Sequence, residues 1–96
     1  MDKNIEWDLY SKIIASNYRI KIFVLLSQKN LSPKQISSKT KITISHVSRT
    51  LKELAELNLI KCLTSKEIKR GKIYSISEKG KIYANEIKRN LENNIK

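Results

Sequence analysis

The spacing of apolar residues changes near residue 59, and this change limits the folds that the chain can adopt. Before that point apolar residues recur every three or four positions, as Val47, Leu51 and Leu54 do, which is the period of an α-helix. Over residues 60–64 the period shortens to two, which is the period of a β-strand. The sequence therefore predicts a mainly α fold with a small β-hairpin.

The length and the apolar runs bound the class of protein. The chain has 96 residues, the usual size of one domain, so we expect a single domain over residues 1–96. Its longest apolar run, Ile22 to Leu26, is far shorter than the about 20 residues that a membrane helix needs. We therefore expect no membrane partner and a cytoplasmic protein.

Helix start signals divide the first part of the chain. The stretch up to residue 15 is predicted to be helical, and Ser16 or Asn17 can cap a core helix from about 17 to 28. Ser32 followed by Pro33 is a strong start signal and predicts a short helix over about 33–39. After a tight connection, Thr43 can cap a third helix that runs to about residue 58.

The second part predicts a hairpin and a closing helix. Strands at 60–64 and 72–77 flank a basic turn that ends with Gly71, where positive φ is easily accepted. Ser77 can cap a last helix that continues to residue 96. Cys62 is interpreted as a small buried strand residue, with a redox-sensing thiol as the alternative.

The charge is strongly positive and unevenly distributed. The net charge is +11, from 20 basic and 9 acidic residues, which favours a partner rich in negative charge. Residues 29–52 contain six basic residues and no acidic one, and the sign reverses at Glu53. Residues 61–72 contain five basic residues against Glu67 alone. Either run alone could be solvated surface, but two basic segments on separate elements favour a polyanionic partner.

Several classes of protein are disfavoured by composition. With one Cys and one His, Cys62 and His46, the chain offers too few ligands for a zinc site of its own. Two glycines are too few for a phosphate-cradling loop, and the only His lies among serines on a predicted exposed helix face. We expect no metal, no cofactor and no enzymatic activity.

Helix, short helix, tight turn, longer helix and basic hairpin, in this order, form the winged helix-turn-helix. Residues 31–61, most of all Val47-Ser48-Arg49 and Leu59-Ile60, resemble the core of small prokaryotic regulators of the ArsR and MarR type, particularly compact archaeal ones. Residues 71–80 are similar to the wing strand of that family and the opening of its closing helix. The resemblance implies a helix-turn-helix at 33–58 within a helical core at 17–60, a wing at 60–76, and flanking helices at 1–15 and 77–96.

The chain departs from the family pattern in the turn and in its metal ligands. Lys41 stands where such families often have Gly, and Ser37 stands where they often have Ala. The metal-sensing subgroup uses clustered Cys and His ligands, such as a Cys pair on the recognition helix, which this sequence does not contain. The resemblance therefore implies a double-stranded DNA partner and a role in transcription, without metal sensing.

A recognition helix enters the major groove by its amino-terminal part. Residues expected to reach base edges are Ile44, Ser45, His46 and Arg49. Arg49 is the candidate for a bidentate contact to guanine, with a phosphate contact or a surface ion pair as the alternative. His46 either contacts a base or a phosphate, or makes no contact with DNA. Residues expected to contact the DNA backbone are Lys34, Thr43, Ser48 and Lys52, with Lys66, Lys69, Arg70 and Lys72 on the wing.

The two ends of the chain contain more apolar residues than a three-helix core needs. Flanking helices commonly pair subunits, so we predict a homodimer, with packing inside one monomer as the alternative. The predicted interface residues are Trp7, Ile13, Ile14, Tyr83, Ile87, Leu91 and Ile95. The leading functional alternative is an architectural or protein-interaction winged helix of the transcription or replication machinery. RNA binding is weaker, because Tyr74 is the only aromatic residue on the predicted strands.

Overall fold

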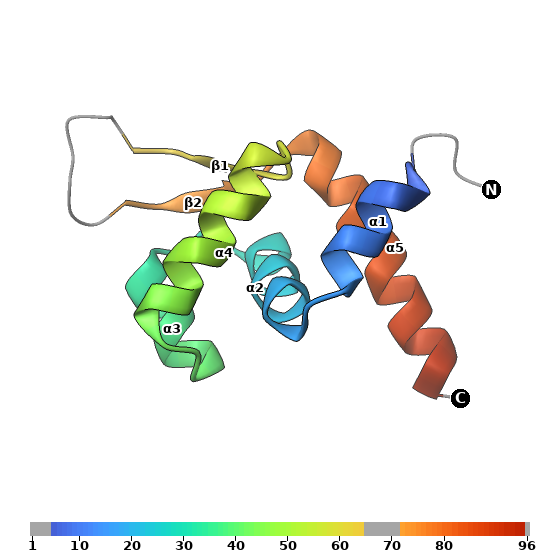
Figure 1. The fold of residues 1–96 in the computed structure, drawn as a ribbon, viewed down its shortest axis with the longest axis horizontal. Helices are drawn as coiled ribbons and strands as arrows, with labels where there is room; N and C mark the ends of the chain where they lie inside the picture. Colours follow the sequence, from blue (N-terminus) through green and yellow to red (C-terminus); the bar gives the residue numbers. More distant parts are fainter. Residues whose placement is uncertain (1–4, 65–71, 96) are drawn as a thin grey trace.

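The computed structural model describes residues 5–64 and 72–95, apart from the side chains of residues 92–95. It confirms a mainly α fold with one antiparallel hairpin (Figure 1). In chain order the elements are α1 (Trp7–Ile14), α2 (Asn17–Gln28), α3 (Pro33–Thr40), α4 (Ile44–Glu56), β1 (Ile60–Cys62), β2 (Tyr74–Ile76) and α5 (Glu78–Ile95).

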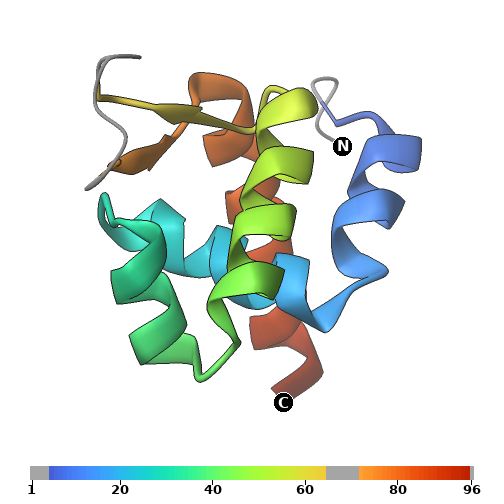
Figure 2. The ribbon, with the colours of Figure 1, turned by 60° about the vertical axis from the view of Figure 1, so that its left-hand side comes forward.

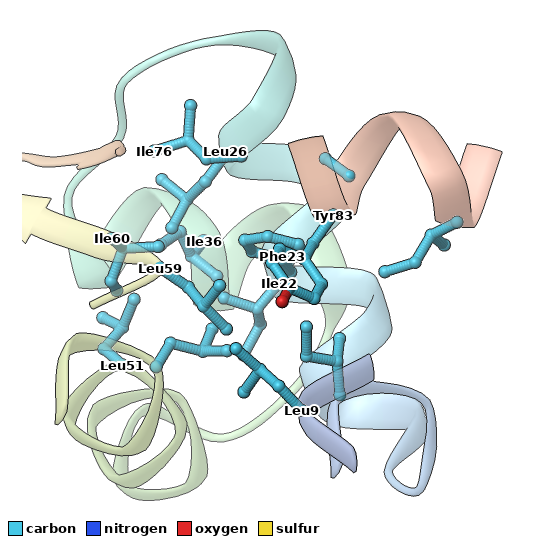
Figure 3. Packing of buried hydrophobic residues seen from close by; sticks show 14 of the residues in the cluster. Leu9, Ile22, Phe23, Leu26, Ile36, Leu51, Leu59, Ile60, Ile76 and Tyr83 are labelled. Carbon is cyan, nitrogen blue, oxygen red and sulfur yellow. The ribbon is translucent and has the colours of Figure 1, made fainter. Parts of the chain in front are cut away.

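Helix α2 lies at the centre of the fold. It contacts α1, α3, α4, α5 and β2, and its residues Ile22, Phe23 and Leu26 are fully buried. Figure 3 shows side chains of the other elements, Leu9 and Tyr83 among them, converging on this helix. Ile20, Val24 and Leu25 are partly buried against the same core, so α2 is covered from several sides and has no single buried face.

Side-chain caps begin three of the helices where the sequence predicts them. The Ser16 hydroxyl accepts a hydrogen bond from the Arg19 amide, and the Ser77 hydroxyl accepts one from the Gly80 amide. At α3, Ser32 and Gln35 form a reciprocal capping box, with Pro33 as the first helical residue. Thr43 occupies the cap position of α4, but its side chain makes no capping hydrogen bond.

Left-handed backbone at non-glycine residues follows the ends of α3 and α4. Lys41, between α3 and α4, has φ 64°, which explains why glycine suits this position. The Ser37 hydroxyl donates to the Ile42 carbonyl across the same turn. Asn58 has φ 63°, and the amides of Asn58 and Leu59 donate to Ala55 and Leu54. This closing motif ends α4 at Glu56, two residues before the predicted end.

The hairpin is short and is tied to the helical core at its base. Its register pairs Ile60 with Ile76 and Cys62 with Tyr74. Leu31, just before α3, exchanges two backbone hydrogen bonds with Tyr74, so the chain before α3 extends the hairpin by a bridge. The interpretation of Cys62 as buried is wrong: only Ile60 of β1 is covered by the core, and Cys62 is exposed.

The flanking helices α1 and α5 pack against each other inside one chain. The Glu6 amide donates to the Tyr83 hydroxyl (N···O 2.8 Å), and Asn90 donates to the Tyr10 hydroxyl. Three of the predicted dimer residues, Ile13, Tyr83 and Ile87, are therefore buried within the monomer. Because α2 packs on α5 and these three side chains are closed off from solvent, they offer no surface to a second subunit, whereas Trp7, Ile14 and Leu91 remain exposed. The side chain of Ile95 lies outside the described residues.

Among the described residues, no helix is both long enough and apolar enough to cross a membrane.

Gly80 permits the close approach of α5 to the end of α4. A Cβ at this position would lie 2.1 Å from the Leu59 carbonyl oxygen and 2.7 Å from Cγ1 of Ile76. We expect Gly80→Ala to lower the free energy of unfolding by about 1–3 kcal/mol, because backbone must move to admit the methyl group. Thermal unfolding should show Tm lower by at least about 4 °C. Lys79→Ala, at the exposed neighbour, is the control, and equal Tm values for the two variants would contradict the close approach.

Lys41 offers a test of strain in the turn. Glycine adopts positive φ without a Cβ clash, so Lys41→Gly should raise the free energy of unfolding by about 0.5–1 kcal/mol, after allowance for the greater freedom of unfolded glycine. Lys41→Ala removes the same charge but keeps a Cβ, so its stability should stay within about 0.5 kcal/mol of the parent. Denaturant unfolding measures both. Equal stability of the two variants would show that the turn is unstrained.

Candidate nucleic-acid interface

Helix α4 separates its apolar and polar residues onto opposite sides. The side packed on the core consists of Val47, Thr50, Leu51 and Leu54. Ser45, Arg49 and Lys52 lie on the opposite side and are exposed, as the helical spacing predicts. His46 and Ser48 are exposed at the flanks, and Ile44 in the first turn is 49% exposed. The first two turns of α4 therefore present a polar surface with one apolar side chain at its start.

The basic residues around α4 are exposed, and the nearest acidic residue is paired. Lys34 and Lys39 of α3 and Lys41 of the turn are all exposed. Glu53, in the third turn of α4, accepts from Arg19 (Nε to Oε1, 3.3 Å). Arg19 also donates to the backbone carbonyl of Lys12 at the end of α1. This pairing reduces the negative charge next to the positive surface and ties α4 to α2 and α1.

Tyr18, which is not among the predicted site residues, also lies at this surface. Its ring centroid is 5.2 Å from that of His46, with the two ring planes at 58°. Tyr18 belongs to the first turn of α2 and is 41% exposed. The only signal in the sequence is an aromatic residue at the start of the predicted core helix, and its contact with His46 depends on how α2 and α4 cross.

The hairpin lies on the same side of the molecule as α3, and α1 lies on the other side of α4 (Figure 2). Lys72, at the start of the returning chain, is exposed. The predicted backbone contacts Lys66, Lys69 and Arg70 lie outside the described residues. Burial raises the pKa of the Tyr74 phenol, and the neighbouring Cys62 adds to the shift.

Apart from Ile44 on α4 and Leu63 beside β1, the exposed large apolar side chains lie on α1, α2 and α5. Trp7 and Ile14 of α1 and Leu91 of α5 are exposed. An open groove of about 490 Å³ is lined by Ile20, Lys21, Val24, Leu25, Lys39, Thr40 and Leu91. The polar surface of α4 and these apolar side chains therefore occupy different parts of the chain.

Comparison with known families decides what this arrangement is. The family of winged helix DNA-binding domains matches residues 18–95, which span α2 to α5. The chain belongs to this family. The match includes the helix-turn-helix, the hairpin and the closing helix.

Solved structures give a consistent picture of this winged helix domain. It is similar to a double mutant of ZitR from Lactococcus lactis, with 28% identity over 81% of this chain and 53% of that chain, and a TM-score of 0.74. ZitR is described as a zinc-responsive member of the MarR family. HlyU from Vibrio cholerae is 23% identical over 93% of this chain and 96% of that chain, with a TM-score of 0.72, and shows the same fold. The family match and these structures together show a winged helix DNA-binding domain.

Two facts bound these comparisons. The winged helix domain spans about half the length of the ZitR chain that it matches. A comparison with curated proteins finds no match.

Within residues 5–64 and 72–95, no group of three or more His, Cys, Asp or Glu side chains is placed to hold a metal ion.

Proposed function

We propose that this winged helix domain is a transcriptional regulator that binds double-stranded DNA in a sequence-specific manner and works in the cytoplasm. One observation carries the proposal: the first two turns of α4 bury one side in the core and expose a polar side without an acidic residue. An α-helix of this width fits the major groove, where each base pair presents a distinct pattern of donors and acceptors. The family match supports DNA as the partner.

The exposed residues divide into two proposed roles. Side chains in the first two turns of α4 read base edges, and these are Ile44, Ser45, His46 and Arg49. Side chains around them contact phosphate groups and set the register of the helix, and these are Lys34, Thr43, Ser48, Lys52 and Lys72, with Lys66, Lys69 and Arg70 of the wing. Glu53 and Glu56 come after the second turn of α4, so they lie outside the groove.

Arg49 and Lys52 provide a matched test of the two roles. Arg49→Ala should lose the preference for one base pair, because a bidentate contact to guanine contributes about 1–3 kcal/mol of discrimination. Lys52→Ala should weaken binding to all sequences and make the slope of log affinity against log salt about one unit less steep. For the parent protein that slope should be near −5, given about six phosphates neutralised per subunit. Selection from a randomised duplex library and binding titrations at several salt concentrations measure these effects.

The outcome also separates the leading alternative. An architectural winged helix would retain DNA without an enriched motif, and Arg49→Ala would then lower affinity for every sequence alike. A slope near zero would contradict the electrostatic part of the proposal. Failure to bind duplex DNA at low salt would favour the protein-interaction module.

We also propose that two copies associate through α1 and α5. Trp7, Ile14 and Leu91 leave apolar side chains in solvent on these helices, while Ile13, Tyr83 and Ile87 keep the same helices joined within one chain. A two-fold dimer would place two recognition helices about 34 Å apart, one helical turn of DNA. Such a dimer would bind an inverted repeat.

Ile14 tests the dimer. A charge at an apolar interface is poorly tolerated, so Ile14→Glu should convert a dimer into a species of 11.2 kDa. Leu63→Glu changes an exposed apolar residue next to the hairpin and should leave the dimer intact. Light scattering at micromolar concentration measures both masses. A parent protein that is monomeric under these conditions would contradict the proposal.

A further inference from the structure

The first turn of α2 lies along one side of α4. Tyr18 contacts His46, and the next residue, Arg19, forms the ion pair with Glu53. His46 and Glu53 are seven residues apart, which is two turns of an α-helix and brings both to the same side. Tyr18 and Arg19 of α2 therefore contact α4 at two positions on the same side of the recognition helix.

The exposure of Tyr18 is unlike that of the tyrosines in the core. The hydroxyl groups of Tyr10 and Tyr83 each accept a hydrogen bond between the flanking helices. Within the described ranges, 5–64 and 72–95, the Tyr18 hydroxyl makes no hydrogen bond, and the side chain is 41% exposed. Its ring lies against that of His46, and about two fifths of the side chain is open to solvent. An exposed phenol without a protein partner can donate a hydrogen bond to a polar ligand at this surface.

The place of the pair in the fold identifies that partner. His46 follows Ser45 and lies one turn before Arg49, within the part of α4 assigned to the major groove. A side chain that contacts His46 from α2 lies beside the groove, where the sugar-phosphate backbone runs. Tyrosine hydroxyls are among the groups that donate to phosphate oxygens in DNA complexes. An edge or tilted contact between two rings also restricts the rotamers of both.

We propose that Tyr18 is a DNA-contacting and positioning residue. Its ring holds the imidazole of His46 toward the base edges, and its hydroxyl donates to a phosphate oxygen at the edge of the groove. This inference rests on the proposed function of α4 and adds α2 to the DNA-binding surface. It also decides between the two alternatives for His46, DNA contact or no role, because an imidazole that the Tyr18 ring holds in the major groove contributes to base preference.

Substitutions at Tyr18 separate the two parts of the role. Tyr18→Phe keeps the ring, so it should weaken binding to all duplexes about threefold and leave the preferred sequence unchanged. Tyr18→Ala should weaken binding about tenfold and relax the preference at the base pair that His46 reads. His46→Ala should relax the preference at the same base pair, and the double variant should relax it no further. Asn17→Ala, at the exposed neighbour in the same turn, is the control and should bind like the parent.

The measurements are selection from a randomised duplex library and affinity for a mixed-sequence duplex, with thermal unfolding to show that each variant is folded. The inference is overturned if folded Tyr18→Ala binds like Asn17→Ala, or if it weakens binding while the motif keeps its preference at every base pair. A parent protein that enriches no motif would contradict the proposed function. In that case the phosphate contact is still tested, because unchanged affinity of Tyr18→Phe for mixed-sequence DNA overturns it.

Discussion

Burial of α2 on several sides at once is the constraint on which the rest of the structure depends. The other helices and β2 pack on it, and Ile22, Phe23 and Leu26 are closed off from water by them. Removing apolar surface from water is the main driving force for such an arrangement. The first turn of the same helix carries Tyr18 and Arg19, which contact α4. The helix that organises the core therefore also sets the position of the surface proposed to read DNA.

Electrostatics complete this arrangement. Basic residues extend from Lys29 to Lys52 without an acidic residue, and acidic residues begin at Glu53. Arg19 pairs with Glu53 at the point where the sign changes, and it also bonds to the end of α1. The positively charged part of α4 therefore ends at the third turn, where the helix is proposed to leave the major groove of DNA. Because α4 is a continuous helix, the change of sign at Glu53 in the sequence is also a change of sign along the helix surface.

Local signals in the sequence were sufficient for the order of the elements and for the starts of α2, α3, α4 and α5, whereas α1 and β2 begin later than predicted. The cap at Ser32 with Pro33 and the cap at Ser77 depend on residues within one turn, so their geometry can be inferred without the rest of the fold. The opposite sides of α4 follow from helical spacing alone. Burial at the flanking helices could not be inferred in this way, because periodicity shows that Tyr83 and Ile87 face something apolar and does not show what covers them. Cys62 and the contact between Tyr18 and His46 depend on tertiary placement in the same sense.

The central claim is that the amino-terminal half of α4, held by the first turn of α2, is the surface that meets DNA. The most direct measurement is a titration of the isotope-labelled protein with a short mixed-sequence duplex, followed by the backbone amide signals in nuclear magnetic resonance spectra. The account predicts that the largest shifts cluster at residues 43–52 and around Tyr18, with little change on the exposed sides of α1 and α5. Largest shifts on α1 and α5, with α4 unaffected, would contradict it.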